Sequence, residues 1–247
     1  MNKLNVLVAN DDGINEKGME ILAKALTKYA NVYVCVPDGP RSAFSHSIKI
    51  LKPITFERVD AIEGIECYKT NGTPADCVRL ATSLLNVKFD IVFSGINNGL
   101  NLGTDIIYSG TVAAAREAHI AYIPSIAISV DRDSFDIVIN ELDNLLDLIF
   151  SKRLYSSEYT LNINFPTAEY KKSNGIKFAR QGIKRFKTEF SKNSDGSYFE
   201  SSSNIKYDTN EDTDVYLASK GYITLVPIKV DQTNTIVLEN LKKTHEF

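Results

Sequence analysis

The architecture of this chain is set by one stretch near its amino end, LNVLVANDDGINEKGMEILAKALTKYANVYVCVP, residues 4–37. The runs LNVLVA (4–9) and VYVCV (32–36) are short, apolar and rich in valine, a pattern that favours buried strands. Between them, the apolar side chains of residues 17–29 recur at the spacing of one helix face. A strand, a helix and a second strand in this order predict a βαβ unit with parallel strands and a right-handed crossover.

The same alternation continues along the chain. A helix is predicted to begin after Thr73, which has the features of an N-cap, with proline at the first helical position and Asp76 at the third. The other predicted elements are strands at 90–94, 124–130 and 161–165 and helices at 111–119 and 135–150. Strands that alternate with helices predict an α/β protein with a doubly wound, mostly parallel, Rossmann-like sheet.

The composition changes in the C-terminal part of the chain. Residues 184–214 are rich in Ser, Asn, Asp, Lys and aromatic side chains, with a turn signal at 193–196. This segment predicts an extended C-terminal β-hairpin arm that protrudes from the body. We therefore expect an α/β core (1–183), the arm (184–214), and a returning helix, strand and tail (215–247).

Composition and charge exclude several classes of protein. The 247 residues carry 28 basic and 31 acidic side chains, a net charge of −3, which lacks the basic footprint of a protein that binds a nucleic-acid polymer. No apolar run is long enough for a signal peptide or a membrane span. Cys35, Cys67 and Cys77 are odd in number and widely spaced, so we expect reduced thiols in a cytoplasmic protein.

Three polar loops follow predicted strands, and the first contains two adjacent aspartates, Asp11 and Asp12. Neighbouring carboxylates repel each other and are costly to enclose unless a cation or a shared proton compensates them. Oxygen ligands of this kind suit Mg²⁺ or Mn²⁺. The structural alternative is an ordinary strand-to-helix turn with Asp12 or Asn15 as the helix N-cap.

The second loop follows the strand at 32–36 and contains Arg41, Ser42 and His46. A guanidinium such as that of Arg41 can grip a phosphate, and a serine oxygen can complete the shell of a hard metal ion. A Ser–His nucleophile pair is the weaker interpretation, because the sequence shows no carboxylate that would orient the histidine. A flexible surface loop is the structural alternative.

The third loop lies between the strand ending at Ser94 and the helix near Thr111, and its length of about sixteen residues far exceeds the usual two to six. Its glycines allow backbone N–H groups to approach an anion closely. Ser109 and Gly110 open the following helix, whose N-terminus favours a bound phosphate. Ligand sites of open α/β sheets lie beyond the carboxyl ends of the strands, so the three loops predict one shared site.

Four motifs in and beside these loops resemble the SurE family, the stationary-phase survival protein nucleotidases. They are NDDG at 10–13, RSxxSxS at 41–47, GTPADCV at 72–78 and SGINxGxNxGxDxxYSGTV at 94–112. The resemblance implies a metal-dependent phosphomonoesterase that releases phosphate from nucleoside 5′- and 3′-monophosphates and, in some members, from short polyphosphate. It also implies homodimers or homotetramers that are joined through extended hairpins.

The resemblance further implies roles for residues of this chain. One divalent cation per subunit, Mg²⁺ or Mn²⁺, is expected on Asp11, Asp12, Ser42 and Asn97, the two aspartates being the catalytic groups. Phosphate contacts are expected from Asn97, Asn101, Ser109, Gly110 and Thr111.

Two positions depart from the family pattern: Lys49 stands where the family usually has threonine or a similar residue, and Ala43 is the second. Ala43 stands where the family usually has glycine, and a positive φ at this position would strain alanine and displace Ser42. Two other functions stay open at this point. One is a non-catalytic regulatory protein that binds nucleotides in the same pocket, and the other is a phosphatase of the haloacid-dehalogenase type, which forms an aspartyl-phosphate.

Overall fold

The computed structural model describes residues 3–244, apart from the side chains of 202–205. The terminal residues 1–2 and 245–247, including His245, to which we assign no role, lie outside the described residues. The strands of the main sheet are β1 (Leu4–Ala9), β2 (Ala30–Pro37), β3 (Glu57–Val59), β4 (Glu66–Thr70), β5 (Ile91–Asn98), β6 (Ser125–Val130), β7 (Thr160–Asn164), β8 (Ile176–Phe178) and β11 (Ile223–Ile228). The helices are α1 (Lys17–Leu26), α2 (Pro74–Leu84), the 3-10 helix η1 (Gly103–Ile107), α3 (Gly110–Ile120), α4 (Phe135–Lys152), α5 (Asp214–Ser219) and α6 (Thr235–Thr244).

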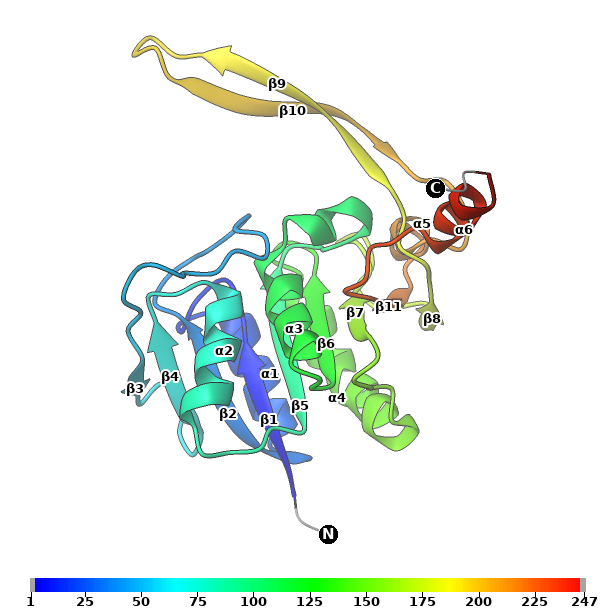
Figure 1. Cartoon of the computed structure of the whole chain (residues 1–247). Coiled ribbons are helices and arrows are strands. Elements are labelled where there is room, and N and C mark those ends of the chain that lie inside the picture. Colours follow the sequence, from blue (N-terminus) through cyan, green and yellow to red (C-terminus); the bar gives the residue numbers. More distant parts are fainter. Residues whose placement is uncertain (1–2, 245–247) are drawn as a thin grey trace.

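The central sheet confirms the predicted α/β architecture (Figure 1). Its strand order is β3-β4-β2-β1-β5-β6-β7-β11-β8, with parallel pairing from β4 through β7 and antiparallel pairing of β11 with β7. Helices α1 and α4 pack their apolar sides on one face of the sheet, and α2 and α3 cover the other. The sheet is therefore doubly wound and mostly parallel, as the alternation of strands and helices predicts.

Local sequence chemistry fixes where the helices begin. At α2 the predicted capping box is present, because the Thr73 hydroxyl accepts from the backbone N–H of Asp76 and the Asp76 carboxylate accepts from the N–H of Thr73. Ser109 caps α3 through its bond from the N–H of Val112, and Thr213 caps α5 in the same way. These caps satisfy N–H groups that the helices leave without intrahelical partners.

The third polar loop is shorter than predicted. Strand β5 continues beyond Ser94 to Asn98, and Asn97 pairs in register with Ser129 of β6 after a shift in the ladder. Glycine and asparagine are typical of loops, so the sequence hides this irregular end of the strand. The 3-10 helix η1 occupies a further part of the predicted loop. Strands β3, β4 and β8 were not predicted either, because each of them is short and carries polar side chains. Helix α6 was also not predicted.

The predicted hairpin arm is present. It consists of β9 (Lys184–Lys192) and β10 (Tyr198–Tyr207), which pair antiparallel in a sheet of their own and turn at residues 193–196. Figure 1 shows the arm reaching out from the body and passing above the edge of the main sheet where β5 ends. The returning segment adds α5 and then β11 to the body. The division at residues 183 and 214 stays a prediction.

The three cysteines, Cys35, Cys67 and Cys77, are buried and free, in agreement with the expectation of reduced thiols. Cys35 and Cys77 pack in the apolar cluster beneath α2. Of the described helices, none has the length and apolar character that crossing a membrane would require.

Candidate functional site

The loops after β1, β2 and β5 meet at one edge of the sheet around a cavity of about 780 Å³. Six of the predicted site residues line this cavity: Asp11, Asp12, Ser42, Asn97, Asn101 and Ser109. Gly110 and Thr111 follow Ser109 in the first turn of α3 and are not among the lining residues. The three polar loops therefore converge at the carboxyl edge of the parallel strands, where ligands of such sheets bind.

Asp11 is almost completely buried, with 5% of its surface exposed. The hydroxyl of Thr111 donates a hydrogen bond to the carboxylate of Asp11 and so fixes the orientation of this side chain. At Gly110 an added Cβ would lie 2.8 Å from the Cβ of Asp11 and 3.0 Å from Cγ of Pro74. Only glycine therefore allows α3 to begin this close to Asp11, and the positive end of the helix faces the carboxylate.

The two aspartates place negative charge in a poorly solvated corner of the cavity. Burial raises the pKa of Asp11 to about 6, opposed by the hydrogen bond from Thr111 and reinforced by the charge of Asp12. Burial also raises the pKa of Asp12, opposed by a hydrogen bond from the backbone of Asn98. Across residues 3–244, no lysine, arginine or histidine forms an ion pair with either carboxylate.

The donor set around this corner fits a hard divalent cation. Asn97 donates its Nδ2 to the carbonyl of Gly99 at 2.6 Å, which leaves Oδ1 as the atom available to a ligand. Ser42 contributes a hydroxyl oxygen to the same cavity. The described residues contain no cluster of three or more His, Cys, Asp or Glu side chains that could hold a metal, so the candidate set combines two carboxylates with neutral oxygens. Oxygen-only sets of this kind are those that Mg²⁺ and Mn²⁺ prefer.

The alternative role of the first loop as a simple helix cap is not what the structure shows. Helix α1 has Glu16 at its N-cap, without a side-chain capping bond. The Asn10 side chain instead closes the turn after β1, because it bonds to both the N–H and the carbonyl of Gly13. The two aspartates therefore lie in a turn that the Asn10 side chain stabilises, and they do not cap helix α1.

The second loop is held against this turn by its backbone. The N–H of Arg41 donates to the carbonyl of Asp11 at 2.7 Å, and the N–H of Ser45 donates to the carbonyl of Tyr108 at 3.1 Å. Ala43 has a φ of +58°, so the position where the family usually has glycine is left-handed in this chain. The guanidinium of Arg41 pairs with Asp38 at 2.7 Å and does not line the cavity.

His46 does not form a Ser–His pair. Its Nε2 lies 2.7 Å from the carboxylate of Glu117 on α3, and Arg79 of α2 approaches the same carboxylate at 3.7 Å. In the part of the chain that the structure describes, no serine hydroxyl bonds to His46. The histidine therefore ties the second loop to the helices.

Asn101 belongs to a buried polar network that the sequence did not reveal. Its Nδ2 donates to the hydroxyl of Ser129 at 2.8 Å, and its N–H donates to Oδ1 of Asn164, also at 2.8 Å. Its carbonyl accepts from the side chains of Asn162 and Asn164. Asparagines alternating with apolar residues inside β7 are the available signal, because buried strand positions that carry amides need partners across the sheet.

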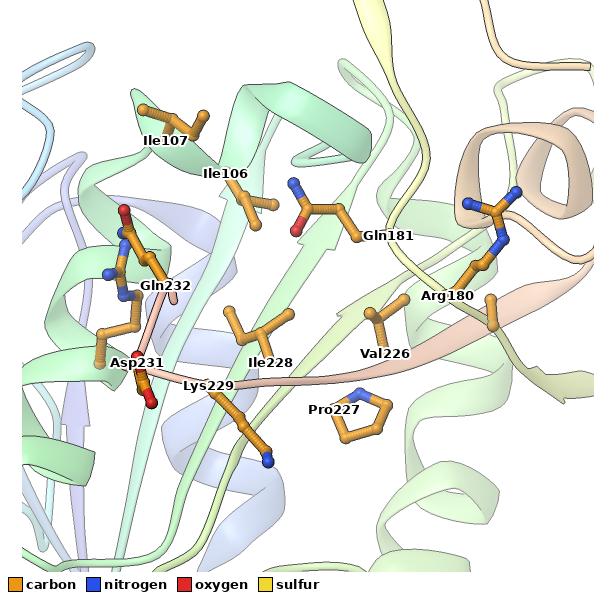
Figure 2. Close-up of a pocket in the computed structure, with 12 residues that line it drawn as sticks. Ile106, Ile107, Arg180, Gln181, Val226, Pro227, Ile228, Lys229, Asp231 and Gln232 are labelled. Atoms are coloured by element: carbon orange, nitrogen blue, oxygen red, sulfur yellow. The ribbon is translucent and has the colours of Figure 1, made fainter. Parts of the chain in front are cut away.

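A second cavity, of about 520 Å³, lies on the face of the sheet beside α3 (Figure 2). In Figure 2, Val226 and Ile228 of β11 point to the side of Ile106, whereas Pro227 and Lys229 point away. Ile107 of η1 lines both cavities, so this turn separates them. None of the predicted site residues lines the second cavity.

Fold and site together define a class: a Rossmann-like α/β protein whose pocket, at the carboxyl edge of its parallel strands, combines paired carboxylates with hydroxyls, amides and a helix N-terminus. Within this class the chain belongs to the SurE family. Residues 6–188 match the family described as Survival protein SurE, which confirms the resemblance seen in the four motifs.

Relatives match the chain over nearly its full length. It is 39% identical to the protein named 5′-nucleotidase SurE from Clostridium botulinum (strain Langeland), over 97% of this chain and 98% of the relative. Identity to the protein of the same name from strain Eklund 17B is 40%, over 98% of this chain and the whole of the relative. The crystal structure of the SurE protein from Aquifex aeolicus superposes with a TM-score of 0.80 at 33% identity, over 98% of this chain and all of that chain.

Proposed function

We propose that this chain is a metal-dependent phosphomonoesterase that releases phosphate from nucleoside 5′- and 3′-monophosphates and from short polyphosphate. The observation that carries the proposal is the meeting, in one cavity, of a carboxylate pair, buried Asp11 and partly exposed Asp12, with the N-terminus of α3. The carboxylates call for a cation and the helix N-terminus favours a phosphate. The Clostridium botulinum relatives bear the name 5′-nucleotidase SurE, which supports a nucleotide as the substrate.

The residues divide the work between binding a cation and orienting the phosphate. One Mg²⁺ or Mn²⁺ ion per subunit, held by Asp11, Asp12, Ser42 and Asn97, would supply a water of lowered pKa and offset charge on the phosphoryl oxygens. Ser109 accepts from the N–H of Val112, so its hydroxyl proton is available to a phosphate oxygen.

The first turn of α3 and the aspartate pair complete the reaction geometry. The backbone N–H groups of Gly110 and Thr111 lie in the first turn of α3 and would hold further phosphate oxygens, and Asn101 lines the cavity. One of the two aspartates would accept the proton of the attacking water, while Thr111 keeps Asp11 in its orientation.

The decisive variant is Asp11→Asn. Chelator-stripped wild type is expected to release phosphate from AMP only after Mn²⁺ or Mg²⁺ is added, and Asp11→Asn is expected to lose at least about 100-fold in kcat/KM. Mn²⁺ should raise the melting temperature of the wild type but not that of the variant, because a ligand stabilises only a fold that binds it. The control is Asp143→Asn, which removes an exposed carboxylate that pairs with Lys28. Metal-independent phosphate release, or a near-normal rate in Asp11→Asn, would contradict the proposal.

Two other functions make different predictions for the same protein. A non-catalytic nucleotide-binding regulator would show calorimetric binding of AMP and no phosphate release at any metal concentration. A phosphatase of the haloacid-dehalogenase type would form an aspartyl-phosphate that beryllofluoride mimics. Tight, stoichiometric binding of beryllofluoride to Asp11 or Asp12 would favour that mechanism.

We also propose that the chain works as a homodimer or homotetramer in the cytoplasm, with nucleoside monophosphates rather than nucleic-acid polymers or membranes as its partners. The arm exposes large aromatic side chains, Phe190, Tyr198 and Phe199. Helix α6 has no buried residue and exposes Ile236 and Leu241. An isolated two-stranded hairpin is only marginally stable in water, so both features support a second copy of the chain as their missing partner.

A further inference from the structure

The cavity of the candidate site extends well beyond the carboxylates. Its volume of about 780 Å³ lies in the range of cavities that enclose whole organic ligands, which is far more than a phosphate group and a metal ion require. The arm provides the far wall, because Phe186 and Thr188 of β9 and Glu200 of β10 line the cavity together with Asp11 and Ser109. Figure 1 shows the arm passing above this edge of the sheet.

The two faces of β9 are used differently. Lys184, Phe186 and Thr188 alternate along the strand and line the cavity. Lys187 and Glu189 project from the other face, where their side chains form an ion pair at 2.7 Å. The register of β9 therefore turns Phe186 toward the site.

The start of the arm is attached to η1, whose residues Thr104 and Asp105 also line the cavity. Lys184 forms an ion pair with Asp105 of η1, and both side chains are largely buried. The carbonyl of Lys184 also accepts from the hydroxyl of Thr104 at 2.6 Å. The ammonium of Lys184 lies 5.6 Å from the centre of the Phe186 ring, within the range of a cation–π contact. These contacts hold the first residues of β9, and with them Phe186, beside the cavity.

We propose that Phe186 is the surface on which the base of a nucleotide stacks while its phosphate lies at the carboxylate and helix end of the cavity. This inference rests on the proposed nucleotidase function and adds the residue that would make a nucleotide preferable to a phosphomonoester without a base. The Phe186 side chain is 40% exposed, so one part of it is open to a ligand. Stacking on an aromatic face accepts every base, because each base presents a π-face.

The test compares two substrates that differ only in the base. With Mn²⁺ present, kcat and KM are measured for 5′-AMP and for ribose 5-phosphate on the full chain. Phe186→Ala is expected to lower the ratio of kcat/KM for AMP to that for ribose 5-phosphate by about 10- to 100-fold, mainly through KM. Phe186→Tyr keeps the ring and should retain the ratio, whereas Phe186→Leu keeps apolar volume without a flat ring and should not.

The matched control is Phe178→Ala, because Phe178 lies on β8, is exposed and does not line the cavity. This variant should keep the wild-type ratio. An unchanged ratio in Phe186→Ala, or an equal fall in Phe178→Ala, would overturn the assignment. If the wild type releases phosphate from neither compound, the proposed function fails, and calorimetric binding of the same two compounds to wild type and Phe186→Ala decides the role of Phe186.

Discussion

Asp11 shows how single residues shape this site. Its carboxylate meets the hydroxyl of Thr111, its backbone carbonyl accepts from Arg41, and its Cβ lies against Gly110. The sequence alone marks Asp11 and Asp12 as candidate site residues, because adjacent carboxylates at the end of a strand are costly unless a cation or a shared proton compensates their charge. It does not predict that Thr111 contacts Asp11, because that contact joins residues one hundred positions apart in the chain.

Ala43 carries the clearest prediction at the residue scale. Its left-handed φ of +58° costs alanine about 1 kcal/mol, while glycine loses about 0.5–1 kcal/mol of chain entropy on folding. Ala43→Gly should therefore leave the free energy of unfolding equal or raise it by up to about 0.5 kcal/mol, and Ala43→Val should lower it by about 2 kcal/mol. Urea unfolding of the metal-free protein measures both. The control is Ala25→Gly inside α1, where the same change should cost about 1 kcal/mol, and a similar loss in Ala43→Gly would refute the strain.

Secondary-structure elements were predictable where the pattern was long or the capping chemistry explicit. The strand at β1, the helix at α4 and the capping box of α2 all follow from apolar spacing and from Thr73 and Asp76. The end of β5 was not predictable, because Asn97 and Asn98 pair with β6 only once that strand is in place. Edge strands such as β3 are stabilised by their neighbour β4 and not by their own sequence pattern.

Asp76 connects α2 to the segment that follows the second loop, so its removal should destabilise both. Its carboxylate accepts from the N–H groups of Thr73 and Lys49, each at 3.0 Å, so it caps α2 and anchors the segment that follows the second loop. Asp76→Ala leaves both donors unpaired and should lower the free energy of unfolding by about 2 kcal/mol. Denaturant unfolding followed by circular dichroism measures this loss. Asp136→Ala, at an exposed first-turn position of α4, is the control, and an equally small effect of the two variants would show that the capping box contributes little.

The whole molecule combines a near-neutral chain with the site that we propose for a cation and a phosphate. A net charge of −3 agrees with this proposal, because a cation, amides and hydroxyls would take the place of a basic patch. The change in amino-acid composition along the chain predicts both the core and the arm. It does not predict that the arm lies above the pocket. That position depends on the pairing of Lys184 with Asp105, which no local pattern reveals.

The outer part of the arm, residues 188–202, should be removable without disturbing the body. Lys187 and Ser203 are partners across β9 and β10, so an Asn-Gly turn between them replaces residues 188–202 and keeps Phe186 and the Lys184–Asp105 pair. Every residue of β9 beyond Lys184 is exposed, so the shortened chain should unfold at nearly the same denaturant concentration.

Light scattering of the full chain should give two or four times 27.5 kDa, and the shortened chain should give a mass at least twofold lower. The reason is that the exposed aromatics Phe190, Tyr198 and Phe199 leave with the arm, and with them the apolar area that a second copy would cover. Leu84→Ser, which removes an exposed apolar residue on α2, should keep the mass of the full chain. A shortened chain that still elutes as the full assembly would assign the contact between copies to another surface, with α6 as the next candidate because its apolar side chains are equally unburied.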